Sequence, residues 1–478
     1  MVKKKFYLTT AIPYVNAKPH AGHALEYVIA DAIHRFRELH GEKVRIVSGA
    51  DENALKNVQA AEGAGVPVQK FLDKNSKIFE EFYKILGVEL DEFRRGTDKK
   101  LHWPGVQNFW KLVDKGGDIY KKKYKGLYCV GCEEFKTEKD LVDEKCPIHD
   151  KKPEIVEEEN YFFKLSKYQN KLLQLIESDT YKIYPSKRKN EVLSFIKSGL
   201  TDFSISRSNE RVRGVGVPVP DDPPAGGQKI YVWFDALNIY QTGIGWGYDE
   251  KLWRRWWPAD LHIIGKDIIR FHAVYWPAML LSAGLPLPKA LLVHGFISSG
   301  GRKMSKSLGN VIDPYEIIEK YGVESLRYFL LSQIPTLDDG EFTVERFEEV
   351  YLADLANGLG NLVARVAGLA KDLRFNIFDS RINKFSTNVK KHIENYQLNL
   401  ALETIWKEMK KADVLINERQ VWSLRGKERE EVLSDLVNRV RQIAIDLRPF
   451  LPETAEKIEK QYKGPKIKSG KPLFPRLL

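Results

Sequence analysis

The chain has 478 residues, of which 43% are hydrophobic and 29% charged, and its formal net charge at pH 7 is +11. This length is too great for one compact core and predicts roughly three domains. No apolar stretch approaches the roughly 18 residues that a transmembrane helix needs, which argues against a membrane protein. The basic excess fits an anionic partner, but it fits an ordinary basic protein equally well.

The first hundred residues alternate between predicted strands and helices. Apolar runs predict buried strands over 6–12 and 44–49, and apolar residues spaced by three and four predict helices over 24–39, 54–62 and 67–86. Such alternation is typical of a parallel, doubly wound α/β sheet. The N-terminus begins with lysines, but Thr, Pro, Tyr and Asn interrupt its apolar run before a signal-peptide core could form.

The turn between the first strand and its helix reads His20-Ala-Gly-His23. In an open α/β sheet, ligands bind beyond the carboxyl ends of the strands, and a helix N-terminus at that point attracts phosphate. Each imidazole can donate a hydrogen bond to a phosphate oxygen, and Gly22 would let a ligand approach the backbone closely. The turn is therefore a candidate nucleotide site, although a plain surface turn fits these four residues too.

The segment 116–213 breaks the alternation of strand and helix. It is rich in charge, aromatic residues and short strand-like runs, and it holds all three cysteines of the chain. We therefore expect it to be an insertion between two halves of the sheet. Because the cysteines are odd in number and clustered, they argue against a secreted disulfide framework and favour a reducing, cytoplasmic location.

The cysteines have the spacing of a zinc site. Two residues separate Cys129 from Cys132, and two residues separate Cys146 from His149. Three thiolates and one imidazole suit a tetrahedral Zn²⁺ ion, and four protein ligands leave no open position for a substrate. The pattern predicts one structural zinc ion, which would organise an insertion that has little core of its own.

The sheet is expected to resume after a Pro- and Gly-rich connector at 214–227. Apolar runs predict strands over 230–234, 261–264 and 290–294. Beyond Pro314 the apolar spacing is helical almost throughout, which predicts an all-helical C-terminal domain.

A Gly-flanked loop follows the last of these strands and carries Lys303 and Lys306. Lysine ammonium groups can compensate the charge that gathers on phosphate oxygens during phosphoryl or nucleotidyl transfer, and the protein need do little covalent chemistry. Taken alone, the loop could also be a solvated basic turn.

Together and in this order, His20-Ala-Gly-His23 and Lys303-Met-Ser-Lys-Ser307 resemble the HIGH and KMSKS motifs of the class I aminoacyl-tRNA synthetases. Ala21 departs from the bulkier apolar residue that is common in the first motif. The resemblance implies a split dinucleotide-type sheet, a connective insertion and a helical anticodon-binding domain. It also implies that His20, His23, Lys303 and Lys306 are catalytic. The implied ATP-binding residues are His20, Gly22, His23, Gly265, Lys303 and Lys306.

Further segments resemble the methionine enzymes of this family, namely Thr10–Tyr14, Gly49–Glu52, Tyr231–Tyr240 and Gly265–His272. A flexible thioether suits aromatic and aliphatic walls with one donor aimed at sulfur. By resemblance, Tyr240 reaches the sulfur, Asp51 the ammonium and Arg207 the carboxylate. Leu237 replaces a proline that many relatives have. The implied methionine-binding residues are Ala11, Ile12, Tyr14, Asp51, Arg207, Trp233, Ala236, Leu237, Tyr240, Asp267, Ile268, His272 and Trp276.

In the helical region, Asn361, Arg365 and Trp422 resemble the anticodon-reading residues of the family. Stacking of an unpaired base on an aromatic side chain contributes about 1–3 kcal/mol. The same residue types on a helix often only pack or face solvent, so this alternative stays open.

The resemblance implies ATP-dependent activation of L-methionine to its adenylate, with Mg²⁺ on the phosphates, and then transfer to the terminal ribose of tRNA(Met). A separate tRNA-binding chain is a further possible partner. The expected division of the chain is 1–115 and 214–295 for the two halves of the catalytic sheet, 116–213 for the insertion, 296–345 for the lysine loop and a stem-contact region, 346–465 for the helical domain and 466–478 for the tail.

Three alternatives compete with this interpretation. The leucine, isoleucine and valine enzymes usually carry a longer editing insertion, and the cysteine enzyme places zinc in its amino-acid site, whereas here the cysteines lie apart from the pocket segments in sequence. A tRNA-binding protein without catalysis would have no need of both histidines and both lysines. A generic nucleotidyl transferase would have no use for the helical domain.

Overall fold

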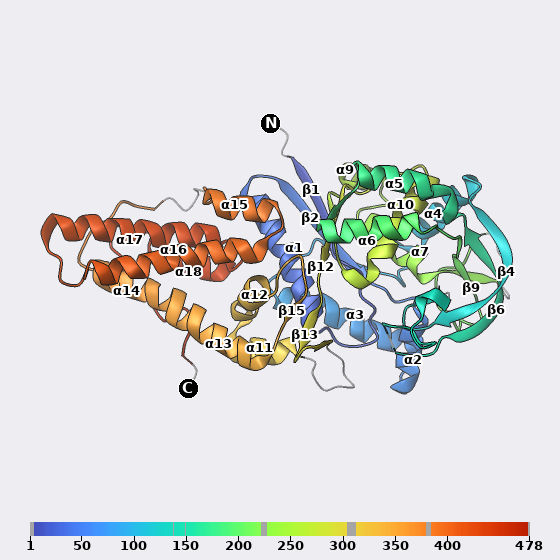
Figure 1. Cartoon of the computed structure of the whole chain (residues 1–478), viewed down its shortest axis with the longest axis horizontal. Coiled ribbons are helices and arrows are strands. Elements are labelled where there is room, and N and C mark those ends of the chain that lie inside the picture. Colours follow the sequence, from blue (N-terminus) through green and yellow to red (C-terminus); the bar gives the residue numbers. More distant parts are fainter. Residues whose placement is uncertain are drawn as a thin grey trace.

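The computed structural model describes residues 4–136, 138–148, 150–220, 227–303, 312–378 and 384–476. Figure 1 shows an elongated molecule with a sheet-containing part at one end and a bundle of long helices at the other. Helix α1 (Ala21–Leu39) lies where the two parts meet. Within the described residues, no helix is both long and apolar enough to cross a membrane.

The centre of the first part is a six-stranded parallel sheet in the order β3-β2-β1-β11-β12-β7. Its strands are β1 (Lys5–Thr9), β2 (Lys43–Ala50), β3 (Glu92–Arg95), β7 (Lys182–Tyr184), β11 (Leu261–Gly265) and β12 (Ala290–His294). The order proceeds from β1 toward β2 on one side and toward β11 on the other. The expected parallel α/β sheet is confirmed, and its topological switch point lies between β1 and β11.

Helices cover both faces of this sheet, which is why its central strands are almost continuously buried. One apolar cluster joins one face to α1 and continues into the helical bundle, and a second fills the other face. Helices α1, α3 (Val68–Ile85) and α6 (Ser186–Lys197) lie directly on the strands, whereas α2 (Leu55–Gly63) packs on α3, α5 (Gln169–Glu177) on α6, and α4 (Trp103–Lys115) on α10 (Trp276–Ser282). Helix α1 begins at Ala21, three residues before the predicted start, and β1 ends at Thr9, three residues before the predicted end.

The 116–213 segment forms a second, antiparallel sheet but does not lie wholly outside the first. The order of the second sheet is β5-β4-β6-β8, with β4 (Ile119–Cys129), β5 (Glu134–Lys136), β6 (Glu154–Phe163) and β8 (Phe203–Ser204). Strand β7 lies within the same segment, yet it pairs with β12 and forms an edge of the parallel sheet.

The prediction of a strand over 230–234 is wrong. Strand β10 (Gln228–Ile230) ends there and pairs with β9 (Ser206–Ser208), not with the parallel sheet, and the next residues form helix α7 (Val232–Ala236). Residues 231–246 are all buried, so the helix has no exposed face whose polar residues would reveal a helical period. The chain continues through α8 (Ile239–Thr242) and α9 (Glu250–Trp256) to β11.

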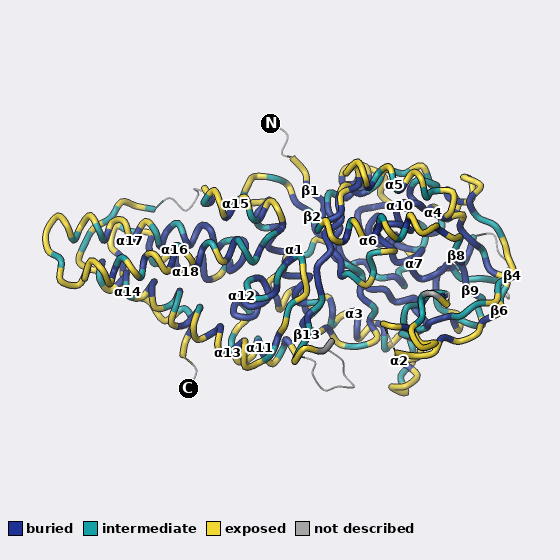
Figure 2. Tube along the Cα trace, in the orientation of Figure 1, coloured by how far each residue is buried: buried dark blue, intermediate teal, exposed yellow. Residues whose placement is uncertain are grey.

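The part beyond Pro314 is mainly helical, as predicted. A short three-stranded sheet joins it to the first part, in the order β14-β13-β15, with β13 (Ile297–Ser299), β14 (Arg302–Lys303) and β15 (Gly340–Glu341). Figure 2 shows the bundle helices with buried inner faces and exposed outer faces. The elements are α11 (Pro314–Tyr321), α12 (Val323–Ser332), α13 (Val344–Val350), a π-helical segment (Tyr351–Gly360), α14 (Asn361–Ala370), α15 (Thr387–Glu394), α16 (Leu398–Glu418), α17 (Gly426–Leu447) and α18 (Pro452–Gln461).

We predict that Gly49→Ala destabilises the sheet. A Cβ atom at Gly49 would lie 2.1 Å from the carbonyl oxygen of Arg94 and 2.9 Å from a methyl carbon of Ile239. Overpacking of this kind costs about 1–3 kcal/mol of unfolding free energy, and a lower Tm should report it. The control is Gly63→Ala, where a Cβ would meet open space. If the two variants melt at the same temperature, the close packing of β2 on β3 is not as described.

Candidate active site

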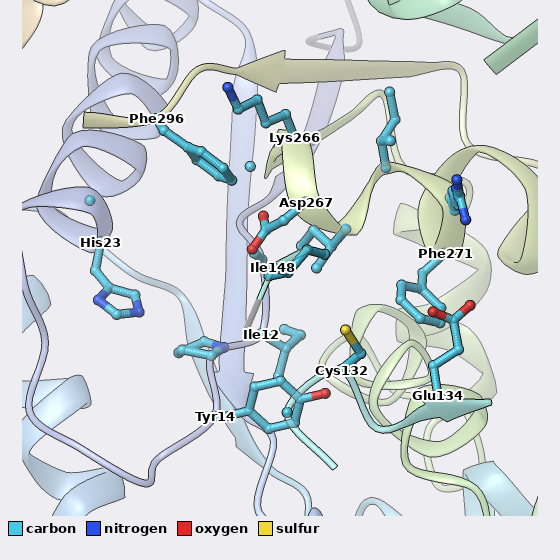
Figure 3. Close-up of a pocket in the computed structure, with 18 of the residues that line it drawn as sticks. Ile12, Tyr14, His23, Cys132, Glu134, Ile148, Lys266, Asp267, Phe271 and Phe296 are labelled. Atoms are coloured by element: carbon cyan, nitrogen blue, oxygen red, sulfur yellow. The ribbon is translucent and has the colours of Figure 1, made fainter. Parts of the chain in front are cut away.

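A cavity of about 830 Å³ opens at the carboxyl ends of β1, β11 and β12. The loops that follow these strands supply much of its wall, together with the N-terminus of α1 and the cysteine-bearing loops of the insertion. Figure 3 shows His23 and Phe296 on one side of the cavity, and Tyr14, Cys132 and Phe271 on the other. The cavity therefore lies at the switch point of the sheet, where the sequence predicted a ligand.

The two histidines of the first motif form the start of α1. His20 is the N-cap, and its Nδ1 atom accepts a hydrogen bond of 3.1 Å from the amide of Gly22. The Nδ1 atom of His23 accepts one of 3.2 Å from the amide of His20. A Cβ atom at Gly22 would lie only 2.9 Å from the His20 ring, so glycine is needed for the ring to fold back over the turn. The spacing of this motif is thus that of a reciprocal capping box.

The capping hydrogen bonds determine which nitrogen of each imidazole can donate a hydrogen bond. Because Nδ1 of His23 accepts a hydrogen bond, the proton of the neutral ring lies on Nε2. Burial, with smaller contributions from His20 and His294, holds the pKa of His23 well below its ordinary value. His23 is therefore a neutral hydrogen-bond donor at the cavity rather than a cation.

Glu26 and His294 form a buried pair in the cavity wall that the sequence did not reveal. Glu26 accepts a hydrogen bond of 2.7 Å from the amide of Ala11, and its other oxygen lies 3.0 Å from Nε2 of His294. Nδ1 of His294 lies 2.8 Å from the carbonyl oxygen of Gly295. With Glu26 ionised, both ring nitrogens of His294 face acceptors, which fits the protonated form of the ring. Burial is the largest single influence and lowers the pKa of His294, but the hydrogen bond and negative charge of Glu26, the bond to Gly295 and the charge of Asp267 together raise it above the ordinary value.

Six of the expected methionine-binding residues line the cavity. They are Ala11, Ile12, Tyr14, Trp233, Asp267 and Ile268. The Trp233 ring stacks on Phe271 at a centroid distance of 3.8 Å, and the Tyr14 ring meets Trp233 edge-on at 6.2 Å. These rings give the cavity an aromatic wall suited to an apolar side chain.

Tyr240 and His272 are fully buried and lie outside the cavity wall. Nδ1 of His272 lies 3.0 Å from the carbonyl oxygen of Ile268 and must donate to it, so Nε2 is an acceptor. The hydroxyl group of Tyr240, 2.8 Å from Nε2, therefore donates its hydrogen to His272. Burial lowers the pKa of His272 to about 4, which agrees with a neutral ring. In this arrangement the hydroxyl hydrogen of Tyr240 is already donated to another residue of the protein.

Asp51 is buried beside the cavity wall and paired with Tyr14 in a parallel β-bridge. Burial and the nearby Asp235 raise the pKa of Asp51 well above its ordinary value, while the cation of Lys56 opposes the shift. The Lys56 ammonium lies 3.1 Å from the centroid of the Tyr14 ring and donates a hydrogen bond of 3.0 Å to the carbonyl oxygen of Gly131. Lys56 thus links the cavity to the cysteine loop, a role that the sequence did not indicate.

Arg207 does not reach the cavity. Its guanidinium group is buried over the rings of Tyr128, Phe135 and Tyr231 and donates to the carbonyl oxygen of Ser206 at 2.7 Å. The expected contact of Arg207 with the methionine carboxylate therefore stays a prediction. Ala236, Leu237 and Trp276 are likewise buried outside the cavity wall.

The three cysteines come together as the spacing predicted. The Sγ atoms of Cys129, Cys132 and Cys146 all lie within 4.8 Å of one another, and those of Cys132 and Cys146 are 3.6 Å apart. Two thiolates on one tetrahedral zinc ion lie about 3.8 Å apart, whereas a disulfide would need about 2 Å. The cluster therefore fits a single metal ion. His149 lies outside the described residues.

The cysteine cluster is closer to the cavity than its place in the sequence suggested. Cys132, Cys146, Pro147 and Ile148 line the cavity, and the Trp233 indole lies 3.5 Å from the carbonyl oxygen of Cys132. The insertion therefore supplies part of the wall. Separation along the chain was a poor guide because β4 returns the cysteines to the cavity edge.

The lysine loop starts beside the cavity. Gly265 and Ile297 line the cavity, and Ile297 begins β13, which pairs with β14. Lys303 ends β14, and the next described residue is Ile312. Lys306 and the side chain of Lys303 lie outside the described part of the chain, so their expected roles stay predictions.

A separate cluster lies on the helical bundle. The Arg365 guanidinium group donates a hydrogen bond of 2.6 Å to the side chain of Asn417 and lies 5.7 Å from the centroid of the Trp422 ring. Trp422 is 52% exposed, and Asn361 is exposed one helical turn before Arg365. The structure thus brings Arg365 and Trp422 together and leaves an aromatic face open to solvent.

A protein-family model described as class I tRNA synthetases (M) matches residues 6–147 and 136–367. A methionine–tRNA ligase from Thermotoga maritima is 39% identical over 477 residues, which cover 95% of this chain and 74% of that protein. One from Mycobacterium leprae is 41% identical over 482 residues, covering 95% and 88%.

Solved structures give the same match. The methionyl-tRNA synthetase of Mycobacterium tuberculosis in complex with methionyl-adenylate superposes with a TM-score of 0.90 at 38% identity, covering 99% of this chain and all of that chain. Its apo form superposes with a TM-score of 0.83 at 35% identity, covering all of this chain and 99% of that one.

We predict that Glu26→Gln lowers the pKa of His294, because the substitution removes the carboxylate that holds the imidazolium. An NMR titration of the histidine ring protons measures the shift. A raised histidine pKa stabilises the fold below the ordinary pKa, and that stability is lost as pH rises through the raised value. The loss of Tm in Glu26→Gln should therefore be larger at pH 5.5 than at pH 9. The buried His262 is the internal control, and an unchanged His294 titration would contradict the pairing.

Proposed function

This chain belongs to the class I methionine–tRNA ligases, and from that premise we propose which residues carry out each part of the reaction. The resemblance of the two sequence motifs to that family is therefore confirmed. The observation that carries the residue assignments is the convergence of the α1 N-terminus with the ends of β1, β11 and β12 on one cavity.

In the first step, we propose, a methionine carboxylate oxygen attacks the α-phosphorus of ATP. A new phosphorus–oxygen bond forms, the bond to the β-phosphate breaks, and pyrophosphate leaves. His20 and His23 donate hydrogen bonds to phosphate oxygens, and Lys303 and Lys306 supply positive charge for the leaving pyrophosphate. Mg²⁺ supplies further compensating charge when it accompanies ATP.

In the second step, a hydroxyl group of the terminal tRNA ribose attacks the acyl carbon of the adenylate. The ester bond forms, and AMP leaves as the acyl–phosphate bond breaks. Neither step needs a protein nucleophile, so the enzyme acts by positioning the reactants and stabilising charge.

Methionine would lie against the aromatic wall made by Tyr14, Trp233 and Phe271. Asp51 is the proposed partner of the methionine ammonium group, and the arriving positive charge would favour the ionised carboxylate against the cost of burial. The contact of Tyr240 with sulfur stays a prediction, because Tyr240 donates its hydrogen to His272 here.

The cysteine cluster is proposed to hold one structural Zn²⁺ through Cys129, Cys132, Cys146 and His149. Three convergent thiolates support this assignment. The ion would fix the loops that form one wall of the cavity, since the carbonyl oxygens of Gly131 and Cys132 meet Lys56 and Trp233.

The helical bundle is proposed to read the tRNA anticodon. The exposed ring of Trp422 offers a stacking face, and Arg365 beside it offers a cation and hydrogen-bond donors. Asn361 on the same helix can bond to a base edge.

The test of the proposed chemistry is ATP–pyrophosphate exchange with each of the twenty amino acids. We expect exchange with methionine, and we expect Lys306→Ala to reduce it by about 10²–10³-fold, since charge stabilisation in the transition state is lost. The control is Lys171→Ala, which removes an exposed lysine on α5 outside the cavity wall.

Each outcome of the exchange assay has a distinct meaning. Exchange with another amino acid would overturn the proposed pocket. An unchanged rate in Lys306→Ala would remove that lysine from the mechanism. No exchange with any amino acid would favour a tRNA-binding protein that lacks catalysis.

We predict that Cys129→Ser abolishes binding of one zinc ion per chain, measured by metal analysis of the purified protein. The KM for methionine in pyrophosphate exchange should rise on the order of tenfold, because one wall of the cavity loses its support. Glu144→Gln is the control, since Glu144 is an exposed residue of the same segment that pairs with Lys152. A zinc content that stays at one in Cys129→Ser would rule out the proposed ligand set.

A further inference from the structure

A single buried arginine joins the two parts of the molecule. Arg327 on α12 is 1% exposed. Its guanidinium group donates to a carboxylate oxygen of Asp31 on α1 at 2.6 Å, to the carbonyl oxygen of Leu86 at 3.1 Å and to that of Phe450 at 3.0 Å. Leu86 follows α3, and Phe450 lies in the turn between α17 and α18. One side chain thus contacts residues of both parts where the two parts meet, a junction that we call the joint.

The same face of α12 holds the start of α18. One carboxylate oxygen of Glu324 accepts a hydrogen bond of 2.8 Å from the amide of Glu453, and the other accepts one of 2.7 Å from the amide of Thr454. A carboxylate at this position satisfies otherwise unpaired amides at a helix N-terminus. Arg327 therefore binds the turn between α17 and α18, and Glu324 binds the start of α18 that follows it.

Helix α1 connects this joint to the catalytic cavity. Its first turn carries His20 and His23, and Asp31 lies eight residues after His23, which is about 12 Å along the same helix. Near the far end of α1, the rings of Phe36 and His40 meet Phe385, just before α15, at 5.5 and 5.3 Å. Figure 1 shows α1 between the sheet and the bundle.

The hydrogen bonds of Arg327 fix the relative orientation of the two parts at this joint, which apolar packing alone does not do. The apolar cluster is continuous from the sheet through α1 into the bundle, but apolar contact is non-directional. A planar guanidinium group that binds several fixed acceptors, here including the carbonyl oxygen of Pro449 at 3.5 Å, specifies one relative orientation. A buried ion pair is weak evidence for stability, so orientation is the better account of why this charge is buried.

We propose that Arg327 is a positioning residue that fixes the helical bundle on α1, so that a tRNA bound by the bundle presents its terminal ribose to the cavity. The proposal rests on the proposed reading of the anticodon by the bundle. It concerns the second step of the reaction, because no described residue of the bundle lines the cavity proposed for methionine and ATP.

The test compares both steps in Arg327→Met, which keeps the length of the side chain and removes its donors. Pyrophosphate exchange should stay within about twofold, which also shows that the catalytic part is folded. The kcat for charging tRNA(Met) should fall about tenfold, in the usual range of coupling between sites. With a tRNA(Met) whose anticodon is changed, the substitution should make little further difference, because that tRNA no longer engages the bundle correctly.

The matched control is Arg35→Met. Arg35 also binds Asp31, at 2.7 Å, but its other hydrogen bond goes to the carbonyl oxygen of Gly87, so both partners belong to the catalytic part. Asp31 keeps one arginine partner in either variant. We expect Arg35→Met to charge tRNA(Met) within about twofold of the wild type.

Three outcomes would overturn the role of Arg327: unchanged charging in Arg327→Met, a parallel loss in both steps, or the same loss in Arg35→Met. The underlying anticodon proposal has its own test in Trp422→Ala, which changes the bundle far from the joint. Normal charging by Trp422→Ala would overturn the assignment of Trp422 and would leave the comparison between Arg327 and Arg35 intact.

Discussion

The burial of α1 is the constraint on which most of this structure depends. The helix packs against the sheet on one side and against α12 of the bundle on the other, and it starts at the catalytic cavity. Most of its residues from Ala21 to Phe36 are therefore buried, including the charged side chains of Glu26 and Asp31. Each of these acids has a basic partner, His294 or Arg327, as burial of charge requires. Residues of one helix thus contribute both to the cavity wall and to the attachment of the bundle.

Much of the fold could be predicted from the sequence, because most strands and helices bury apolar side chains in a regular pattern. The strands at β1, β2, β11 and β12 were apolar runs of ordinary strand length, and the C-terminal helices showed a clear period of three and four. Prediction failed where burial was complete. Residues 231–246 are buried on every side, so no exposed face revealed a helical period, and a run predicted to be a strand became α7. The edge strand β7 is only three residues long and lies in a segment whose composition suggested an insertion.

The cavity was predicted in part. Local spacing found the turn at His20 and the cysteine cluster, because those side chains act on neighbours in the sequence or have the spacing of ligands to one metal ion. It did not find the pair of Glu26 with His294, since 268 residues separate them and only the sheet order brings them together. Two rules would have helped: Glu26 follows His23 by three residues on one helix face, and His294 ends a strand at the ligand-binding edge. The aromatic surroundings of Arg207 had no sequence signal of this kind.

The order of the central strands has a consequence for synthesis on the ribosome. Strand β1 pairs on one side with β2, which follows closely, but on the other side with β11, where Leu8 meets Leu261. At about 5–20 residues per second, roughly 12 to 50 seconds pass between translation of these two partners. During that time one edge of β1 has no strand beside it, and such an edge invites pairing with other chains. The nascent N-terminal half therefore carries an open strand edge that could pair with other chains, and the arrival of β11 closes that edge.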